Sequence, residues 1–99
     1  MNTQQVVDSL KLIYTNEAMN DVQVLSVLDS QLFVSIIDRW AKFFNHDAIN
    51  LVADYIYDII YNGDSSHTLE WKFEQAIIQS LILEANLDIT LVPPEFPSN

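Results

Sequence analysis

Apolar residues recur at helical spacing near the start of the chain. Between residues 3 and 19 they return every three or four positions, which is the period of an amphipathic α-helix. The ridge runs through Val6, Leu10, Ile13 and Glu17, with Val7 and Tyr14 beside it. The pattern therefore predicts a first helix over this segment.

The segment from residue 22 to residue 44 is also expected to be helical. Its runs are rich in β-branched residues, so a β-hairpin over 22–37 is the alternative. Helix is favoured because polar and apolar positions separate onto opposite faces at helical spacing. The polar stripe is Gln31, Ser35, Asp38, Lys42 and Asn45, and the facing ridge is Leu25, Leu28, Leu32, Ile36, Trp40 and Phe44, with Phe33 and Ile37 beside it. Asp29 and Ser30 both cap helices well, so a kink or a second start is expected there.

Two further helices follow, each with a candidate cap. Asn45 or Asp47 can begin a third helix, and Asn62-Gly63 can end it, with the glycine expected as a left-handed cap. Thr68 can begin a fourth helix. The inner face expected for the third helix is Ile49, Val52, Ala53, Ile56 and Ile60, and the core ridge expected for the fourth is Leu69, Phe73, Ile77 and Leu81. The solvent-exposed stripe expected for the fourth helix is Lys72, Gln75, Gln79 and Asn86.

Helices joined by short links predict an all-α protein, a small antiparallel four-helix bundle. A hairpin at 22–37 would instead make the class α+β. Pro93, Pro94 and Pro97 are incompatible with a helix near the C-terminus. We therefore expect one helical domain over residues 1–87 and an extended tail over 88–99. The tail could pack on its own domain or serve as a docking peptide with Phe96 as its anchor.

The composition supports one hydrophobic core and excludes several kinds of site. The chain has 99 residues, of which 49% are apolar, and it contains no cysteine and one glycine. Disulfides, thiolate metal sites, cysteine nucleophiles and glycine-rich phosphate loops are therefore excluded. We find neither a basic leader followed by an apolar run nor an 18-residue apolar stretch. A cytoplasmic protein without membrane contact is therefore expected.

The charge is strongly acidic and unevenly distributed. The formal net charge is −10, and residues 43–99 hold nine acids against Lys72 alone. A surface of this sign repels phosphate, so direct binding of nucleic acid or of an anionic membrane is not expected. The expected partner is therefore a protein with a basic surface.

Residues for catalysis or metal binding are sparse. The two histidines, His46 and His67, lack the spacing of a metal motif, and both are expected in loops near helix ends. Glu70 and Glu74 are four residues apart, which is typical of a solvated helix face. No serine has a histidine at a recognised spacing. The sequence therefore predicts no enzyme, no metal and no cofactor.

The third helix carries the most suggestive surface. Its carboxylates and tyrosines recur at helical spacing on the side opposite the apolar residues. The residues of this candidate binding face are Asp47, Asn50, Asp54, Tyr57, Asp58 and Tyr61. Tyrosine is enriched in binding hot spots, and carboxylates steer a basic partner. The alternative is that the tyrosines are half-buried at the edge of the bundle and the acids only keep the protein in solution.

These features favour a small acidic protein-binding module. The leading hypothesis is a stoichiometric inhibitor or immunity-type protein that masks the basic site of a nucleic-acid-acting protein, with mimicry of nucleic acid as a special case. The alternative is a structural or assembly subunit, a homodimer included, that associates through apolar residues and has no inhibitory role. The contact would then lie at the margins of the core, at Tyr14, Val34, Phe43 and Tyr55.

Overall fold

All regular secondary structure in the described part of the chain is helical. The computed structural model describes residues 1–16, 22–63 and 66–88, and these form five α-helices and one 3-10 turn. The elements are α1 (Thr3–Asn16), α2 (Val22–Asp29), α3 (Gln31–Trp40), η1 (Ala41–Phe43), α4 (His46–Asn62) and α5 (Leu69–Glu84). The all-α class is confirmed. Residues 17–19 of the expected first helix and most of the expected tail, Phe96 included, lie outside the described residues.

The hairpin alternative is wrong, and the helix expected over 22–44 is interrupted. Residues 22–29 and 31–40 are two helices, with Ser30 between them. The Ser30 side chain accepts a hydrogen bond from the Phe33 N–H at 3.2 Å and donates one to the Val27 carbonyl at 2.7 Å. Ser30 therefore ends α2 and begins α3, the second start that its residue type favoured. With five helices instead of four, the four-helix bundle is not confirmed.

The other expected caps are present. The Asn45 side chain accepts from the Ala48 N–H at 2.8 Å and begins α4, and the Thr68 hydroxyl accepts from the Trp71 N–H at 3.1 Å and begins α5. Asn45 also donates from Nδ2 to the carbonyl of Glu84 at 2.9 Å. The first residues of α4 are thereby tied to the last residues of α5, so the two helices run antiparallel.

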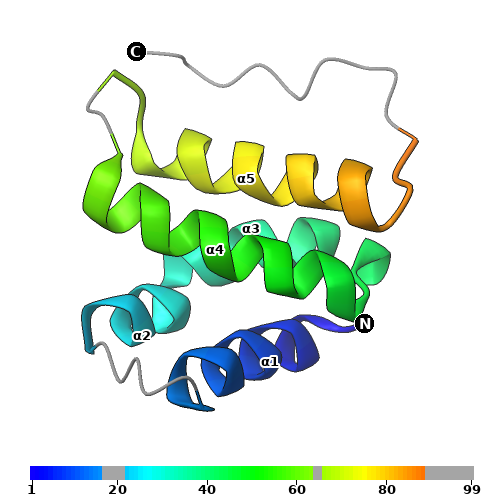
Figure 1. Cartoon of the computed structure of the whole chain (residues 1–99), viewed down its shortest axis with the longest axis horizontal. Helices are drawn as coiled ribbons and strands as arrows, with labels where there is room; N and C mark the ends of the chain where they lie inside the picture. Colours follow the sequence, from blue (N-terminus) through cyan, green and yellow to red (C-terminus); the bar gives the residue numbers. More distant parts are fainter. Residues whose placement is uncertain (17–21, 64–65, 89–99) are drawn as a thin grey trace.

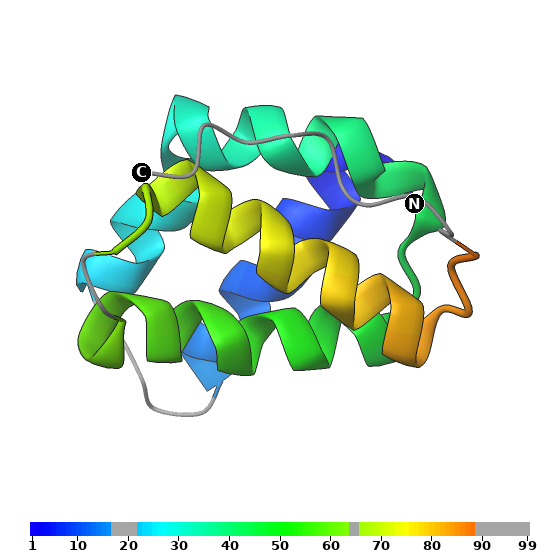
Figure 2. The ribbon, with the colours of Figure 1, turned by 90° about the horizontal axis from the view of Figure 1, so that it is seen from above.

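The helices are arranged in tiers around a continuous core. Helix α5 lies across α3 and α4 on one side, and α1 lies across them on the other (Figures 1 and 2). The Phe33 and Phe73 rings meet edge to face with centroids 5.5 Å apart, which joins α3 to α5. On the opposite side, the buried Tyr14 hydroxyl donates to the carbonyl of Ala53, which joins α1 to α4. Tyr14 is therefore a core residue, and its expected place at an assembly margin is wrong.

Two leucines expected in the core are exposed instead. Leu32 and Leu69 keep 38% and 44% of their surface in contact with solvent. Both follow a cap by one or two residues, since Ser30 begins α3 and Thr68 begins α5. Both leucines thus lie in the first turn of their helix, whereas Ile36 and Phe73, one turn further along the same ridges, are buried.

The left-handed cap lies at the end of α5 and not at the end of α4. Gly63 has φ −69° and ψ 144°, an extended conformation, so the expected left-handed glycine is wrong. Asn86 instead adopts φ 54°, and the Leu87 N–H returns to the carbonyl of Leu81 at 3.0 Å. Asparagine is the residue after glycine that tolerates this region best, because its short polar side chain bonds locally.

Gly63 is required for a different reason, which gives a first prediction. A Cβ at this position would lie 2.4 Å from the carbonyl oxygen of Ile59. Replacing Gly63 with alanine therefore forces the end of α4 to shift, and we expect a loss of about 1–3 kcal/mol in the free energy of unfolding. Urea denaturation followed by circular dichroism measures the loss. An unchanged midpoint would show that the turn absorbs the Cβ without strain.

Candidate functional site

The candidate binding face expected from the sequence is a real surface of α4. All six of its residues are exposed and none belongs to the core: Asp47, Asn50, Asp54, Tyr57, Asp58 and Tyr61. We call this set the α4 face. The side of α4 that turns inwards carries the buried residues Ala48, Ile49, Val52, Ala53 and Ile56. The helical period thus separates the two sides as expected, although Ile60 is only partly buried.

The tyrosines of the α4 face form a pair on the surface. The Tyr57 and Tyr61 rings lie with centroids 4.8 Å apart at an interplanar angle of 44°. They keep 39% and 44% of their surface exposed, so each is about half-buried, as the alternative interpretation of this face also expected. Two rings in contact present a broad apolar area that is already partly ordered, and such area contributes strongly to protein binding.

The negative charge of the α4 face is not neutralised from within its own helix. Helix α4 contains no lysine or arginine. Within the part of the chain that the structure describes, neither Asp47 nor Asp54 forms an ion pair, and Asp58 only accepts a hydrogen bond from Asn62 at 3.2 Å. The basic residues Lys11 and Arg39 are paired elsewhere, with Asp29 and with the glutamates of α5. Among the described residues, the face therefore presents carboxylates that form no ion pair, beside a pair of aromatic rings.

A groove of about 370 Å³ runs between α4 and α5 next to this face. The α4 wall consists of Tyr55, Asp58 and Ile59, and the α5 wall consists of Trp71, Lys72, Gln75, Ala76 and Gln79. Asp58 belongs to both the groove and the α4 face, so the two form one continuous surface. The sequence pattern does not reveal this groove and places Lys72, Gln75 and Gln79 only on a solvent-exposed stripe of the last helix.

His67 supports one wall of the groove. Its imidazole is stacked on the Trp71 indole, with centroids 3.9 Å apart and an interplanar angle of 24°. Its Nδ1 is buried and has no hydrogen-bond partner among the described residues. His67 lies in the loop before α5, as expected, whereas His46 is the first residue of α4. The histidine thus has a packing contact that its sequence spacing did not predict.

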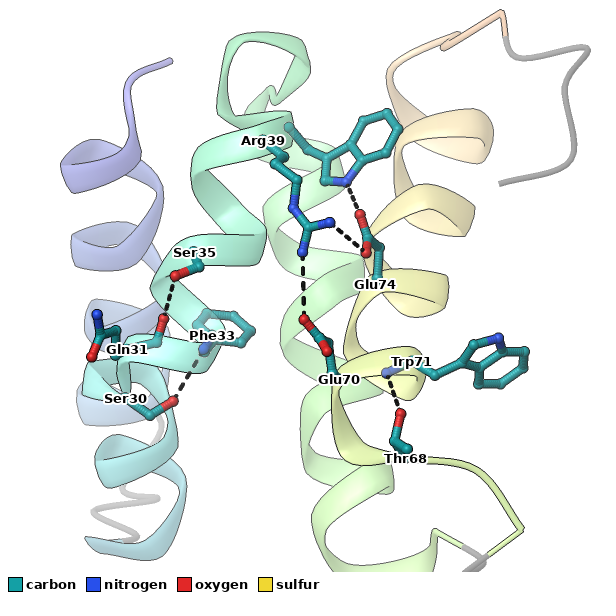
Figure 3. Close-up of polar contacts among 10 residues, drawn as sticks. Ser30, Gln31, Phe33, Ser35, Arg39, Thr68, Glu70, Trp71 and Glu74 are labelled. Carbon is teal, nitrogen blue, oxygen red and sulfur yellow. Dashed lines mark hydrogen bonds and ion pairs between the residues drawn. The ribbon is translucent and has the colours of Figure 1, made fainter. Parts of the chain in front are cut away.

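The expected solvated pair on α5 is wrong for Glu74. Glu70 is exposed, but the Glu74 side chain is completely buried. The Trp40 indole donates to its Oε2 at 2.7 Å, and Arg39 Nη1 lies 3.2 Å from its Oε1 (Figure 3). The second guanidinium nitrogen of Arg39 lies 3.8 Å from Glu70. A side chain from α3 therefore covers Glu74, and a helical period cannot reveal a cover that comes from another helix.

Other chemistry is sparse in the described residues. No three histidine, aspartate or glutamate side chains of residues 1–16, 22–63 and 66–88 gather in a geometry that could hold a metal ion. Over the same residues, no helix combines the length and the apolar character that crossing a membrane requires. Of the four residues considered for an assembly contact, Phe43 is exposed, Val34 and Tyr55 are partly buried, and Tyr14 is buried.

The fold and the surface together define an acidic, all-α protein that combines an exposed carboxylate–tyrosine face with an adjoining groove. Comparisons with protein-family models, with curated proteins and with solved structures found no match.

Proposed function

We propose that this chain is a protein-binding module whose α4 face docks on the basic surface of a protein partner in the cytoplasm. The partner class that fits best is a nucleic-acid-acting protein, which the chain would inhibit stoichiometrically, as an immunity-type protein does. The observation that carries the proposal is the α4 face itself, where carboxylates that form no ion pair among the described residues lie beside two contacting tyrosines. A surface that normally receives phosphates has the complementary charge.

The tyrosines and the carboxylates have different roles in this proposal. Carboxylates at the rim accelerate encounter with a basic surface, and the effect weakens as salt screens the field. Tyr57 and Tyr61 supply area that leaves water on binding and so slow dissociation. The spacing of carboxylates along α4 is sparse for a continuous imitation of a phosphate backbone, so general charge complementarity is favoured over strict mimicry.

The test is a pull-down from lysate of the source organism with the full chain as bait. The lysate is treated with nuclease, and captured proteins are identified by mass spectrometry at low and high salt. We expect a basic nucleic-acid-acting protein at near-equal stoichiometry, released by high salt. Association rates of the purified pair are then measured by stopped flow. The Asp47→Asn/Asp54→Asn double variant should associate about three- to tenfold more slowly.

A matched control separates the position of the charge from its amount. The Asp8→Asn/Asp38→Asn variant removes the same charge from α1 and α3, and its amides can still accept from Gln4 and Thr3. Its association rate should stay close to that of the parent chain. If both variants slowed association equally, net charge and not the position of the carboxylates on the α4 face would set the rate, which would contradict the proposal. Capture of only the chain itself, or of an apolar partner indifferent to salt, would favour the alternative of an assembly subunit.

A further inference from the structure

The groove between α4 and α5 is a feature of the surface that the proposed docking does not yet use. It opens beside the α4 face, and Asp58 forms part of both. Its volume of about 370 Å³ is near the lower end of ligand sites, which is room for one long side chain or a small fragment. A partner seated on the α4 face would therefore place its own side chains at the mouth of this groove.

The groups around the groove have a recognisable combination of properties. Tyr55 and Trp71 provide aromatic rings from opposite walls, Asp58 provides a carboxylate, and Gln75 and Gln79 provide amide oxygens. Ile59 and Ala76 add apolar surface. The His67 ring is stacked on Trp71, which restrains the indole that forms part of the α5 wall.

We propose that the groove receives an arginine side chain of the basic protein partner. A guanidinium is planar, so it stacks on aromatic rings, and its fork of N–H donors pairs with a carboxylate and with amide oxygens. An ammonium would gain less, because it is a compact charge that is strongly hydrated and does not stack. This inference rests on the proposed function, since the α4 face brings the basic partner to the groove.

Lys72 makes it possible to test whether the groove prefers a cation or an anion. It is the only basic residue among the eight that line the groove. Its ammonium repels a guanidinium and would attract a carboxylate or a phosphate. Removing its charge must therefore strengthen the binding of an arginine and weaken the binding of an anion.

The experiment uses the full chain labelled with ¹⁵N and a capped Gly-Arg-Gly peptide as the probe. We expect the peptide to shift the indole N–H signal of Trp71, which the Trp71→Phe variant assigns, and the side-chain amide signals of Gln75 and Gln79. The matched peptide with citrulline, which keeps the shape but lacks the charge, should bind about tenfold more weakly. The lysine peptide should bind about threefold more weakly than the arginine peptide.

Two variants test the groove itself. Lys72→Met should raise the affinity for the arginine peptide about threefold, whereas Gln75→Ala, at a partly buried position on the same wall, should lower it. Weaker binding after Lys72→Met, or equal shifts with the citrulline peptide, would overturn the inference. The titration needs no captured partner and no change in the α4 face. A failed titration therefore leaves the proposed docking standing, and a failed pull-down leaves these shifts unchanged.

Discussion

Replacing Phe33 with alanine is expected to lower the free energy of unfolding by about 3–5 kcal/mol. Phe33 is completely buried, and its ring meets Phe73 edge to face across the boundary between α3 and α5. The substitution removes this contact and leaves a cavity that the neighbouring helices can fill only in part. Because a domain of this size is stable by about 5–15 kcal/mol, the loss is a large share of the total.

Phe43 provides the matched control for that substitution. It lies in η1, only a few residues along the same segment, but 39% of its surface is exposed. Phe43→Ala removes the same atoms where water can occupy the space, so a loss of about 1 kcal/mol is expected. Urea denaturation followed by far-ultraviolet circular dichroism compares the two variants. Equal losses would contradict the placement of Phe33 at the centre of the core.

The α4 face could be predicted from the sequence because it depends on one helix alone. In α4, carboxylates and tyrosines occupy one side of the helical period, and residues such as Val52 and Ile56 occupy the other. No knowledge of the neighbouring helices is needed to assign the inward side. The caps Asn45, Ser30 and Thr68 were predictable for a similar reason, because each bonds a backbone N–H three residues away.

The groove and the burial of Glu74 could not be predicted in the same way. Helix α5 is apolar on almost every side, with Ile78 buried and Ile82 and Leu83 exposed, so its period does not identify one inward face. Glu74 is covered by Arg39, a residue of another helix that only the tertiary fold brings near. The walls of the groove likewise come from two helices. Features of this kind depend on how helices pack, and a one-dimensional pattern does not contain that information.

Replacing Arg39 with methionine is expected to lower the free energy of unfolding by about 2–3 kcal/mol. The substitution keeps a long apolar stem but leaves the Glu74 carboxylate buried without a counter-charge. The loss is smaller than the 3–5 kcal/mol typical of a fully buried pair, because 47% of the Arg39 side chain is exposed and water screens it. Lys42→Met is the control, because it removes a basic charge two residues after Trp40. It should lower the free energy of unfolding by less than about 0.5 kcal/mol.

A second substitution tests whether the buried charge of Glu74 causes the stability loss of Arg39→Met. Glu74→Gln in the Arg39→Met background removes the unpaired charge and keeps an oxygen that can accept from the Trp40 indole. The double variant should therefore be more stable than Arg39→Met alone by about 1–2 kcal/mol, as measured by urea denaturation. If the double variant were the less stable of the two, the loss would come from the packing of the Arg39 stem.

The same ion pair links the core to the proposed binding surface. Glu70 and Glu74 project from α5 towards Arg39 on α3, whereas Trp71 projects away from this cluster (Figure 3). Anchoring the two glutamates fixes the rotation of α5, and that rotation places Trp71 and Gln75 on the wall of the groove. Arg39→Met should therefore also weaken the binding of the arginine peptide to the groove. Adding Glu74→Gln to Arg39→Met should recover part of that affinity. If Arg39→Met lowers stability but leaves the Trp71 indole signal unchanged, the ion pair stabilises the fold without positioning the wall of the groove.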